Sequence, residues 1–314
     1  MEIQIVEFFK SWSCKFCDLL FSFTNLLGED LFFYLILFIL IWAYRKEYAL
    51  KYAVVYLTSC VFNIGLKKVV RRPRPLGATA GGYSFPSGHS QSFSSVGTGL
   101  LYEANKNQYP KKKWMRIELL FEFIIFGALV GIGRMYFSQH YLTDVLAGLI
   151  LGVVITVAAT YILDVVIDRL KGSKLTLDKI LLIFVPVVFV GYILIISLDI
   201  FTDIDDLFKV YRIIGIYLSI VVGYFIDKKW IKYNPDDTLK NKLIKVITGS
   251  ATIMVMYMMV VYKAELDVVR GADPHEVMPI YYFVLGLIAT VVLPWIFKTI
   301  KNEPQQSIEN KGKK

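Results

Sequence analysis

Long apolar runs recur along most of this 314-residue chain, and they constrain its fold more than any other feature. Between Leu31 and Phe297 many of the runs reach about 17 residues or more, enough to cross a hydrocarbon core about 30 Å thick. Hydrophobic residues make up 56% of the chain and charged residues only 19%, whereas a soluble domain has about 25% charged residues. We therefore expect an all-α polytopic transmembrane helical bundle.

The first segment, residues 3–27, mixes apolar residues with the charges of Glu7, Lys10 and Asp18. This pattern fits either an amphipathic helix in the membrane interface or a short first span. The N-terminus lacks a basic n-region and a small-residue cleavage site, so we expect no cleavable signal peptide. Further spans are expected at about residues 31–45, 49–66, 90–104, 117–133, 141–166, 179–198, 209–226, 245–262 and 280–297.

The net charge of +9 comes from basic residues in short connections between the spans. They follow every second span, as at Lys111–Lys113 and Lys228–Lys229, so these connections share one face. The positive-inside rule makes that face cytoplasmic and indicates a plasma membrane protein, with an internal eukaryotic membrane as the alternative. The charge is that of a protein beside anionic lipids, and we expect no nucleic acid partner.

One loop on the opposite face breaks this pattern. The sequence "LKKVVRRPRPLGATAGGYSFPSGHS" begins at Leu66 and is strongly basic, although it follows the second expected span. The next loop on that face carries Arg134, His140 and Asp144. Because basic residues on the outer face work against the topology rule, we expect this loop to bind an anion.

His140 and Asp144 are spaced i, i+4, which places them on one face of a helix beginning near Tyr141. A carboxylate one turn away can accept the Nδ1 proton and leave Nε2 as a nucleophile or base. The alternative is a helix cap with an ion pair.

The segment Pro86-Ser87-Gly88-His89 has the composition of a helix start. Ser87 is a good N-cap, and Gly88 lets a ligand approach the backbone amides, which would form an anion seat. A plain cap, a metal ligand, an anion pocket and half of a catalytic pair are the competing interpretations.

Lys67 and Arg74 lie seven residues apart at the end of an expected span. Arg supplies a bidentate fork and Lys a point charge, so the two could hold a phosphate from different directions. Interfacial snorkelling is the alternative. For Arg71 and Arg72, an anion funnel and contact with lipid headgroups are equally compatible with the sequence.

Other candidate residues carry little signal. Cys14 and Cys17 form a CxxC pair without the further ligands that zinc requires, so we interpret them as structural or incidental thiols. His275 and the acidic stretch at 203–206 are interpreted as loop residues.

Together, Lys67-x6-Arg74-Pro75, Pro86-Ser87-Gly88-His89 and Arg134-x5-His140-x3-Asp144 form an ordered set. This set resembles the three-part signature of the type 2 phosphatidic acid phosphatase (PAP2) superfamily, which also holds bacterial acid phosphatases and vanadium haloperoxidases. The resemblance implies a phosphatase core at 30–168, preceded by an interfacial helix or first span at 1–29. A C-terminal four-helix transmembrane extension at 179–297 and a basic cytoplasmic tail at 298–314 would follow.

The family mechanism, carried onto these positions, uses His140 as nucleophile, Asp144 to orient it, and His89 as the acid and later the base. The phosphate-binding groups that the resemblance implies are Lys67, Arg74, Ser87, Gly88 and Arg134. The third motif of the family usually opens with Ser-Arg, and here it opens with Gly133-Arg134, which removes a hydroxyl contact to phosphate. No metal or cofactor is implied.

The resemblance therefore implies a membrane enzyme that hydrolyses a lipid phosphate monoester or a prenyl diphosphate at the extracytoplasmic face. Phosphatidate, undecaprenyl diphosphate, phosphatidylglycerol phosphate and phosphorylated sphingoid bases are the candidate substrates. A transporter or flippase for anionic lipid, a vanadate-dependent haloperoxidase and a pseudoenzyme are the alternatives, and a homo-oligomer is compatible with the sequence.

Overall fold

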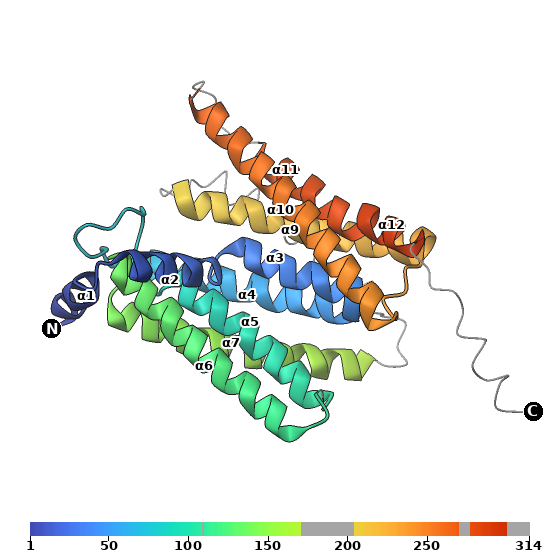
Figure 1. Ribbon diagram of the computed structural model, residues 1–314, viewed down its shortest axis with the longest axis horizontal. Helices are drawn as coiled ribbons and strands as arrows, with labels where there is room; N and C mark the ends of the chain where they lie inside the picture. The colour runs from blue at the N-terminus through green and yellow to red at the C-terminus, as the bar shows by residue number, and fades with distance from the viewer. Residues whose placement is uncertain (109, 171–203, 270–276, 300–314) are drawn as a thin grey trace, which may run out of the picture. The chain divides into compact units, whose positions relative to one another are not determined.

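The computed structural model describes residues 1–108, 110–170, 204–269 and 277–299, and every element of regular structure in these ranges is helical (Figure 1). The prediction of an all-α fold is confirmed. The expected span at 179–198, His275, residue 203 of the acidic stretch and residues 300–314 of the basic tail lie outside the described residues. Residues 204–206 of the acidic stretch begin a helix, so the expectation that they lie in a loop is wrong.

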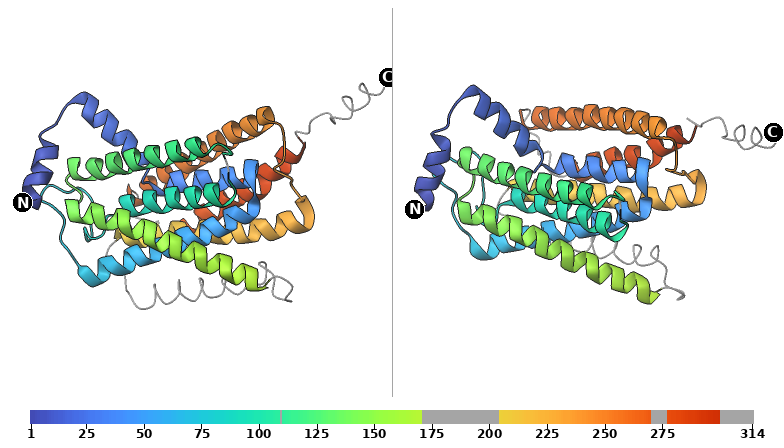
Figure 2. Two further views of the ribbon diagram at one scale, coloured as in Figure 1. Left: turned by 90° about the horizontal axis from the view of Figure 1, so that it is seen from below. Right: turned by 60° about the horizontal axis from the view of Figure 1, so that its bottom comes forward.

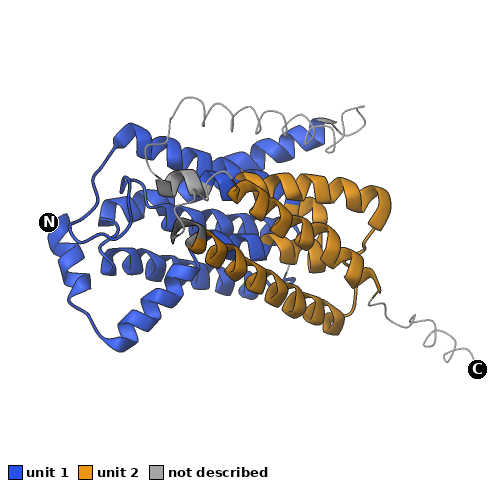
Figure 3. Ribbon diagram, turned by 90° about the horizontal axis from the view of Figure 1, so that it is seen from above, with its two compact units in different colours: residues 1–36, 50–213 blue, residues 37–49, 214–314 orange. Residues whose placement is uncertain are grey.

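The chain forms two compact units, coloured separately in Figure 3. Unit 1 comprises residues 1–36 and 50–213, and unit 2 comprises residues 37–49 and 214–314. The helices of the first half of the chain are α1 (Glu2–Lys10), α2 (Lys15–Leu26), α3 (Asp30–Ile39), α4 (Lys46–Val70), α5 (Gly88–Lys106), α6 (Lys113–Tyr136) and α7 (Leu142–Leu170). Those of the second half are α9 (Ile204–Ile226), α10 (Leu239–Val269), α11 (Met278–Leu287) and α12 (Leu293–Thr299), with π-helical turns at Leu40–Tyr44, Asp227–Ile231 and Ile288–Val292.

Among the described residues, five helical segments are long and apolar enough to cross a membrane. They are Lys46–Val70, Leu142–Arg169, Val210–Ile231, Leu239–Ala264 and Met278–Thr299. The spans expected at 90–104 and 117–133 form helices α5 and α6, which are not among the five. Helix α5 is rich in Ser and Gly, and most of its first three turns are buried against neighbouring helices.

Helices α5 and α7 of unit 1 lie unusually close together (Figure 2). A Cβ atom at Gly148 would stand 2.6 Å from the carbonyl oxygen of Ser87, and one at Gly152 would stand 2.5 Å from that of Gln91. Ser94 Oγ donates a hydrogen bond of 2.6 Å to the carbonyl of Leu149. Small residues that let helix backbones approach in this way are typical of membrane bundles. This close approach and the Ser94 hydrogen bond hold the start of α5 against the start of α7.

A buried ladder of polar side chains joins α4 to α5. Asn63 Nδ2 donates to Gln91 Oε1 at 2.8 Å, and Gln91 Nε2 donates to the carbonyl of Ser59 at 2.8 Å. The hydroxyls of Ser59 and Ser95 lie 2.6 Å apart. Because each buried amide finds partners, the ladder fixes the register of the two helices. Lys67 follows Asn63 by one turn and so lies near the start of α5.

The N-terminal segment is two helices rather than one element over residues 3–27. Cys14 caps α2, and its sulfur accepts a hydrogen bond of 3.1 Å from the Cys17 amide. Helix α2 packs on α6, where Tyr136 Oη donates to Asp18 Oδ1 at 2.6 Å. After a connection at Leu27–Glu29 the chain enters α3, whose direction differs from that of α2 by 53°.

Unit 2 gathers around Trp42, whose side chain is fully buried. Its Nε1 donates to the carbonyl of Ala289 at 2.7 Å, and Tyr233 Oη donates to the Trp42 carbonyl at 2.5 Å. Lys46 forms an ion pair with Asp227. These contacts explain why residues 37–49 group with the C-terminal helices, whereas the sequence placed them within a core at 30–168.

Candidate active site

All the residues of the three motifs lie in unit 1. Helices α4 and α6 end where α5 and α7 begin, so the motif residues occupy one end of the bundle. Lys67 is in the last turn of α4, Arg74 follows in the loop, Ser87 to His89 open α5, Arg134 is in the last turn of α6, His140 precedes α7, and Asp144 is in its first turn.

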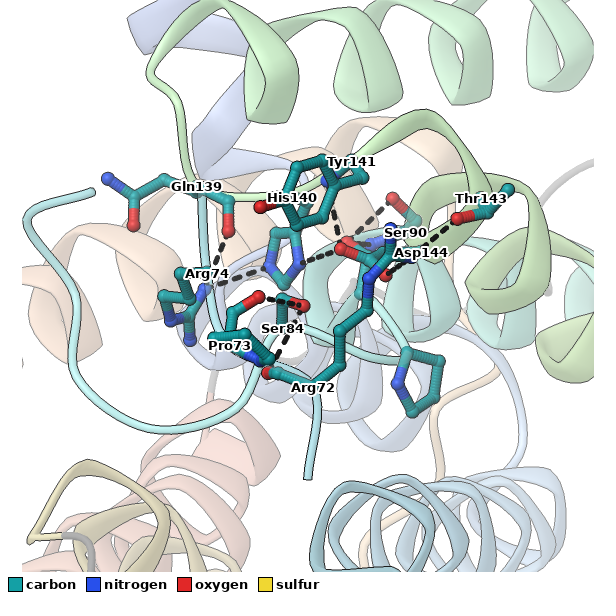
Figure 4. A network of polar contacts seen from close by, with 12 residues as sticks. Arg72, Pro73, Arg74, Ser84, Ser90, Gln139, His140, Tyr141, Thr143 and Asp144 are labelled. Atoms are coloured by element: carbon teal, nitrogen blue, oxygen red, sulfur yellow. Dashed lines mark hydrogen bonds and ion pairs between the residues drawn. The ribbon is translucent and has the colours of Figure 1, made fainter. Parts of the chain in front are cut away.

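The His140 side chain is only 2% exposed, and Arg74 approaches it directly (Figure 4). Arg74 Nη1 lies 3.3 Å from His140 Nε2 and donates to the carbonyl of Gln139 at 2.9 Å, while its Nε donates to Gly81 at 2.7 Å. A guanidinium has donors and no acceptor. Nε2 must therefore be the acceptor, with its lone pair toward Arg74, and the ring's own proton is on Nδ1.

The electrostatics of this end favour a neutral imidazole. Burial lowers the pKa of His140 well below its usual 6.5, and the charges of Arg134, Arg74 and Lys67 lower it further. Lys67 and Arg134 are each 8% exposed. Three cations from three segments thus act on one ring and favour its unprotonated form.

Asp144 is fully buried and lies beside His140, but the two side chains are not hydrogen-bonded. The distance from His140 Nδ1 to Asp144 Oδ2 is 3.7 Å, beyond hydrogen-bond range. Oδ2 accepts instead from the Tyr141 amide at 2.8 Å, which caps the start of α7, and Oδ1 accepts from Arg72 Nη1 at 2.8 Å. Nδ1 has no hydrogen-bond partner, although His140 is buried.

Arg72 contacts Asp144 and its neighbours, whereas the sequence suggested either an anion funnel or contact with lipid headgroups. Its Nη1 also donates to Thr143 Oγ1, its Nη2 pairs with Glu2 from α1, and its guanidinium carbon lies 4.2 Å from the centre of the Tyr141 ring. Ion pairing and stacking hold the guanidinium in one place. Arg72 therefore fixes the carboxylate of Asp144 rather than contacting lipid headgroups.

The start of α5 has the expected cap. Ser87 is the N-cap residue, and its Oγ accepts from the Ser90 amide at 3.4 Å. Its own amide donates to the Asp144 carbonyl at 3.0 Å, which ties this turn to α7. His89 points toward the connection between α2 and α3, where its Nε2 lies 2.9 Å from Glu29 Oε1.

Arg134 is held by α2. Its Nη1 donates to Asn25 Oδ1 at 3.4 Å, and its buried Nε makes no hydrogen bond. At the neighbouring Gly133 a Cβ atom would stand 3.3 Å from Thr24 Oγ1. Helix α2 thus occupies the space beside Gly133, where the superfamily usually has serine.

Sequence reasoning missed Glu29, Asn25 and Gln139. Gln139 Nε2 donates to Thr79 Oγ1 at 2.8 Å, and its Oε1 accepts from the Ala80 amide at 3.2 Å, so it anchors the loop that carries Arg74. None of these residues belongs to a local pattern. Each has a partner about 60 residues or more away, and only the folded chain brings the two together.

Within the part of the chain that the structure describes, no group of three His, Cys, Asp or Glu side chains is arranged to hold a metal ion. Three organic cations, Lys67, Arg74 and Arg134, act on His140. Such a cluster suits an anion with several negative oxygens.

The chain is similar to known proteins over both its halves. The family model described as the PAP2 superfamily matches residues 48–167, and the model described as the transmembrane extension of PAP2 superfamily phosphatases matches residues 211–305. Phosphatidylglycerophosphatase B of Bacillus subtilis (strain 168) is 34% identical over 116 residues, which are 36% of this chain and 57% of that protein. A probable sphingosine-1-phosphate phosphatase of Dictyostelium discoideum is 26% identical over 186 residues, 55% of this chain and 45% of that protein.

The chain thus spans about half the length of the curated relatives it matches. Among solved structures, a transmembrane PAP2-type phosphatidylglycerolphosphate phosphatase from Bacillus subtilis aligns with a TM-score of 0.46 at 23% identity, over 52% of this chain and 84% of that one. LpxE of Aquifex aeolicus aligns with a TM-score of 0.43 at 20% identity, over 51% and 94%. With both family models matched in order along its length, the chain belongs to the PAP2 superfamily.

Proposed function

We propose that this chain is a lipid phosphatase that releases phosphate from a lipid phosphate monoester or diphosphate, through a phosphohistidine on His140 and without a metal ion. One observation carries the proposal. A buried, neutral imidazole presents the lone pair of Nε2 to Arg74 at 3.3 Å, among the charges of Lys67 and Arg134. An anion drawn to these cations would meet a nucleophile.

Phosphoryl transfer needs the reacting groups to be positioned and the charge on the phosphoryl oxygens to be stabilised. In this proposal Lys67, Arg74 and Arg134 hold those oxygens, and Ser87 and the Gly88 amide assist from the N-terminal end of α5, where the helix dipole favours an anion. The three cations supply the positive charge that metal ions supply in other phosphatases.

In the first step the Nε2 lone pair of His140 attacks phosphorus and forms the P–N bond. The P–O bond to the lipid breaks, and the leaving oxygen takes a proton from His89. The imidazole of His140 becomes positive, and its Nδ1 proton turns to the carboxylate of Asp144. The present separation of 3.7 Å is compatible with this role, because catalytic hydrogen bonds are often long before substrate binds.

In the second step His89 takes a proton from a water molecule as the water oxygen attacks phosphorus. The P–N bond breaks, its electron pair returns to Nε2, and inorganic phosphate leaves. His89 is then protonated again and His140 neutral, so the cycle is balanced without a cofactor.

We place the site at the extracytoplasmic face of the plasma membrane, because basic connections mark the opposite face. Substrates would enter from the outer leaflet. The matched relatives are named for phosphatidylglycerophosphate and sphingosine-1-phosphate, which supports a lipid bearing a phosphate monoester. Phosphatidate carries the same phosphate monoester, whereas undecaprenyl diphosphate would be cleaved at its phosphoanhydride bond, with the lipid monophosphate as the leaving group.

The test is release of inorganic phosphate from these four lipids by the purified protein, compared with His140→Ala. We expect release from at least one lipid, a loss of about 10³-fold or more in the variant, inhibition by vanadate and no effect of EDTA. Equal release by the two proteins would refute the role of His140. Movement of lipid across the membrane with no phosphate release would favour a transporter instead.

A further inference from the structure

Glu29 lies beside His89 in a position that no motif of the sequence explains. Its Oε1 is 2.9 Å from Nε2 of His89, and it comes from the connection between α2 and α3, 60 residues earlier in the chain. We propose that Glu29 is a positioning residue for His89, which keeps the ring oriented and charged so that it can give its proton to the leaving lipid oxygen. This inference rests on the proposed phosphatase function.

The connection between α2 and α3 packs closely against the imidazole of His89. A Cβ atom at Gly28 would stand 2.7 Å from Cβ and 2.8 Å from Cδ2 of His89, so no larger residue could occupy position 28 without moving the ring. Glycine is needed here for close approach. The His89 ring therefore lies directly against the backbone before Glu29, which restricts the positions it can take.

The residue after Glu29 anchors the connection on its other side. Asp30 Oδ1 accepts from Tyr56 Oη at 2.9 Å, and Asp30 Oδ2 lies 3.1 Å from Arg212 Nη2. The Asp30 side chain is buried, and such a paired, buried carboxylate is costly to displace. The backbone at Glu29 is thus held between the contact of Gly28 with His89 and the ion pair of Asp30.

The charge on Glu29 suits this role. Burial raises the pKa of its carboxyl, but the hydrogen bond and charge of His89, with Arg212 and Arg134 nearby, lower it to about 2. Glu29 is therefore ionised at neutral pH. A carboxylate at hydrogen-bond distance favours the protonated form of an imidazole and fixes which nitrogen faces it.

This geometry assigns the two ring nitrogens different tasks. Nε2–H donates to Glu29 throughout the cycle, so the proton that reaches the leaving oxygen comes from Nδ1. After the P–O bond breaks, His89 is neutral with its lone pair on Nδ1, and that nitrogen takes the proton of the attacking water. Glu29 exchanges no proton and contacts no reacting atom.

The experiment uses two substrates that differ in their need for an acid. Dioctanoyl phosphatidate has an alkoxide leaving group that must be protonated, whereas p-nitrophenyl phosphate releases a stable phenolate. Values of kcat/KM are measured for the wild type, Glu29→Gln and Glu29→Asp, with Glu118→Gln as control. Glu118 is exposed on α6, outside the site.

For Glu29→Gln we expect kcat/KM on phosphatidate to fall by about tenfold to 100-fold, which is part of the roughly 10²–10⁴-fold that acid catalysis contributes. On p-nitrophenyl phosphate, whose leaving group needs no proton, we expect kcat/KM to fall by less than about threefold. The basic limb of the phosphatidate pH profile should move to lower pH, because the neutral amide no longer favours the charged ring. Glu29→Asp should recover part of the activity, and Glu118→Gln should match the wild type on both substrates.

Equal losses on both substrates, or no loss on phosphatidate, would overturn the proposal. If Glu29→Gln does not fold, the same comparison of leaving groups is made with Glu29→Asp, whose shorter carboxylate weakens the contact. The proposed function has its own control. His140→Ala must lose both activities, and if it keeps them the phosphatase mechanism fails whatever the Glu29 variants do.

Discussion

The two ends of helices α4, α5 and α7 both carry cations, but the cations have different partners. At the end away from the site, Lys51 Nζ lies 2.6 Å from Glu103 and 2.7 Å from Asp164, and Lys106 lies 2.6 Å from Asp164. At the site end, Arg74 donates to two backbone carbonyls and to the neutral ring of His140.

This difference separates cations that stabilise a helix end from cations that surround the proposed binding site. Carboxylates at the far end neutralise Lys51 and Lys106, and so the pairs join three helices without leaving a net charge. At the site end, the charges of Lys67, Arg74 and Arg134 reach His140 and lower its pKa. Positive charge concentrated around a neutral ring in this way attracts an anion.

The largest effect should come from removing Arg74. We expect Arg74→Ala to lower kcat/KM for the best lipid substrate by about 10²–10³-fold, because one donor to the phosphoryl oxygens is lost. Lys106→Ala removes a cation from the other end and should change kcat/KM by less than about twofold, since its side chain is 49% exposed and its ion pair contributes little. Similar losses in the two variants would remove the distinction between the two ends.

Arg72 gives the next largest effect. Without its guanidinium the Asp144 carboxylate loses a hydrogen bond of 2.8 Å and keeps the Tyr141 amide, on its other oxygen, to orient it. We expect Arg72→Ala to lower kcat about 10–100-fold, as loss of an outer-shell partner commonly does, with little change in the inhibition constant of vanadate. A weakened vanadate affinity with unchanged kcat would instead make Arg72 part of the anion funnel.

Packing offers a third comparison of the two ends. Gly148→Ala at the site end would place a methyl group 2.6 Å from the Ser87 carbonyl, and overpacking of this kind costs about 1–3 kcal/mol. A Cβ atom at Gly99, toward the far end, would have its nearest neighbours at 3.6 Å. Gly148→Ala should lower both the thermal midpoint and kcat/KM, whereas Gly99→Ala should leave kcat/KM unchanged and not lower the midpoint. Equal effects would mean that the site does not depend on the close approach of α5 and α7.

The smallest expected effect is a shift in pH dependence. Because the pKa of His140 is lowered well below 6.5, the ring stays neutral as pH falls through 6.5, and the acid limb due to its protonation lies below that pH. Arg134→Gln removes one of the charges that lower this pKa, so the acid limb of kcat/KM should move to higher pH by up to about one unit. The measurement is kcat/KM from about pH 4.5 to 8, with Lys106→Ala as the control that should not shift.

Protonation of His140 should also change the free energy of unfolding, in a direction that the lowered pKa determines. In the unfolded chain His140 binds a proton near its usual pKa of 6.5, while in the folded chain it does not. Its contribution therefore lowers stability as pH falls below 6.5, and this loss should be smaller in His140→Ala.

Much of this site could be predicted from the sequence because its signals are local. The spacing of His140 and Asp144 and the N-cap at Ser87 follow from helix geometry, and the basic loop after α4 is conspicuous because it breaks a topology rule. The long apolar runs likewise indicated a helical membrane bundle. These features needed no knowledge of which helices are neighbours.

What the sequence could not indicate depends on neighbours. The contact of Glu29 with His89, and that of Asn25 with Arg134, join segments far apart in the chain. The glycine at position 133, where the superfamily usually has serine, also depends on a neighbour, because Thr24 of α2 occupies the space beside it. Trp42 was assigned to the first half of the chain by its position, but its indole binds the carbonyl of Ala289 in unit 2.

The most direct test of the account is to trap the phosphorylated enzyme. The protein is mixed with lipid labelled with ³²P in its phosphate, quenched in base within the first turnover and digested. We predict label on the peptide that contains His140, stable in base and released in acid as a phosphorus–nitrogen bond requires, and absent from His140→Ala. Rapid turnover of the lipid with no such label on the wild type, or with label on another residue, would contradict the account.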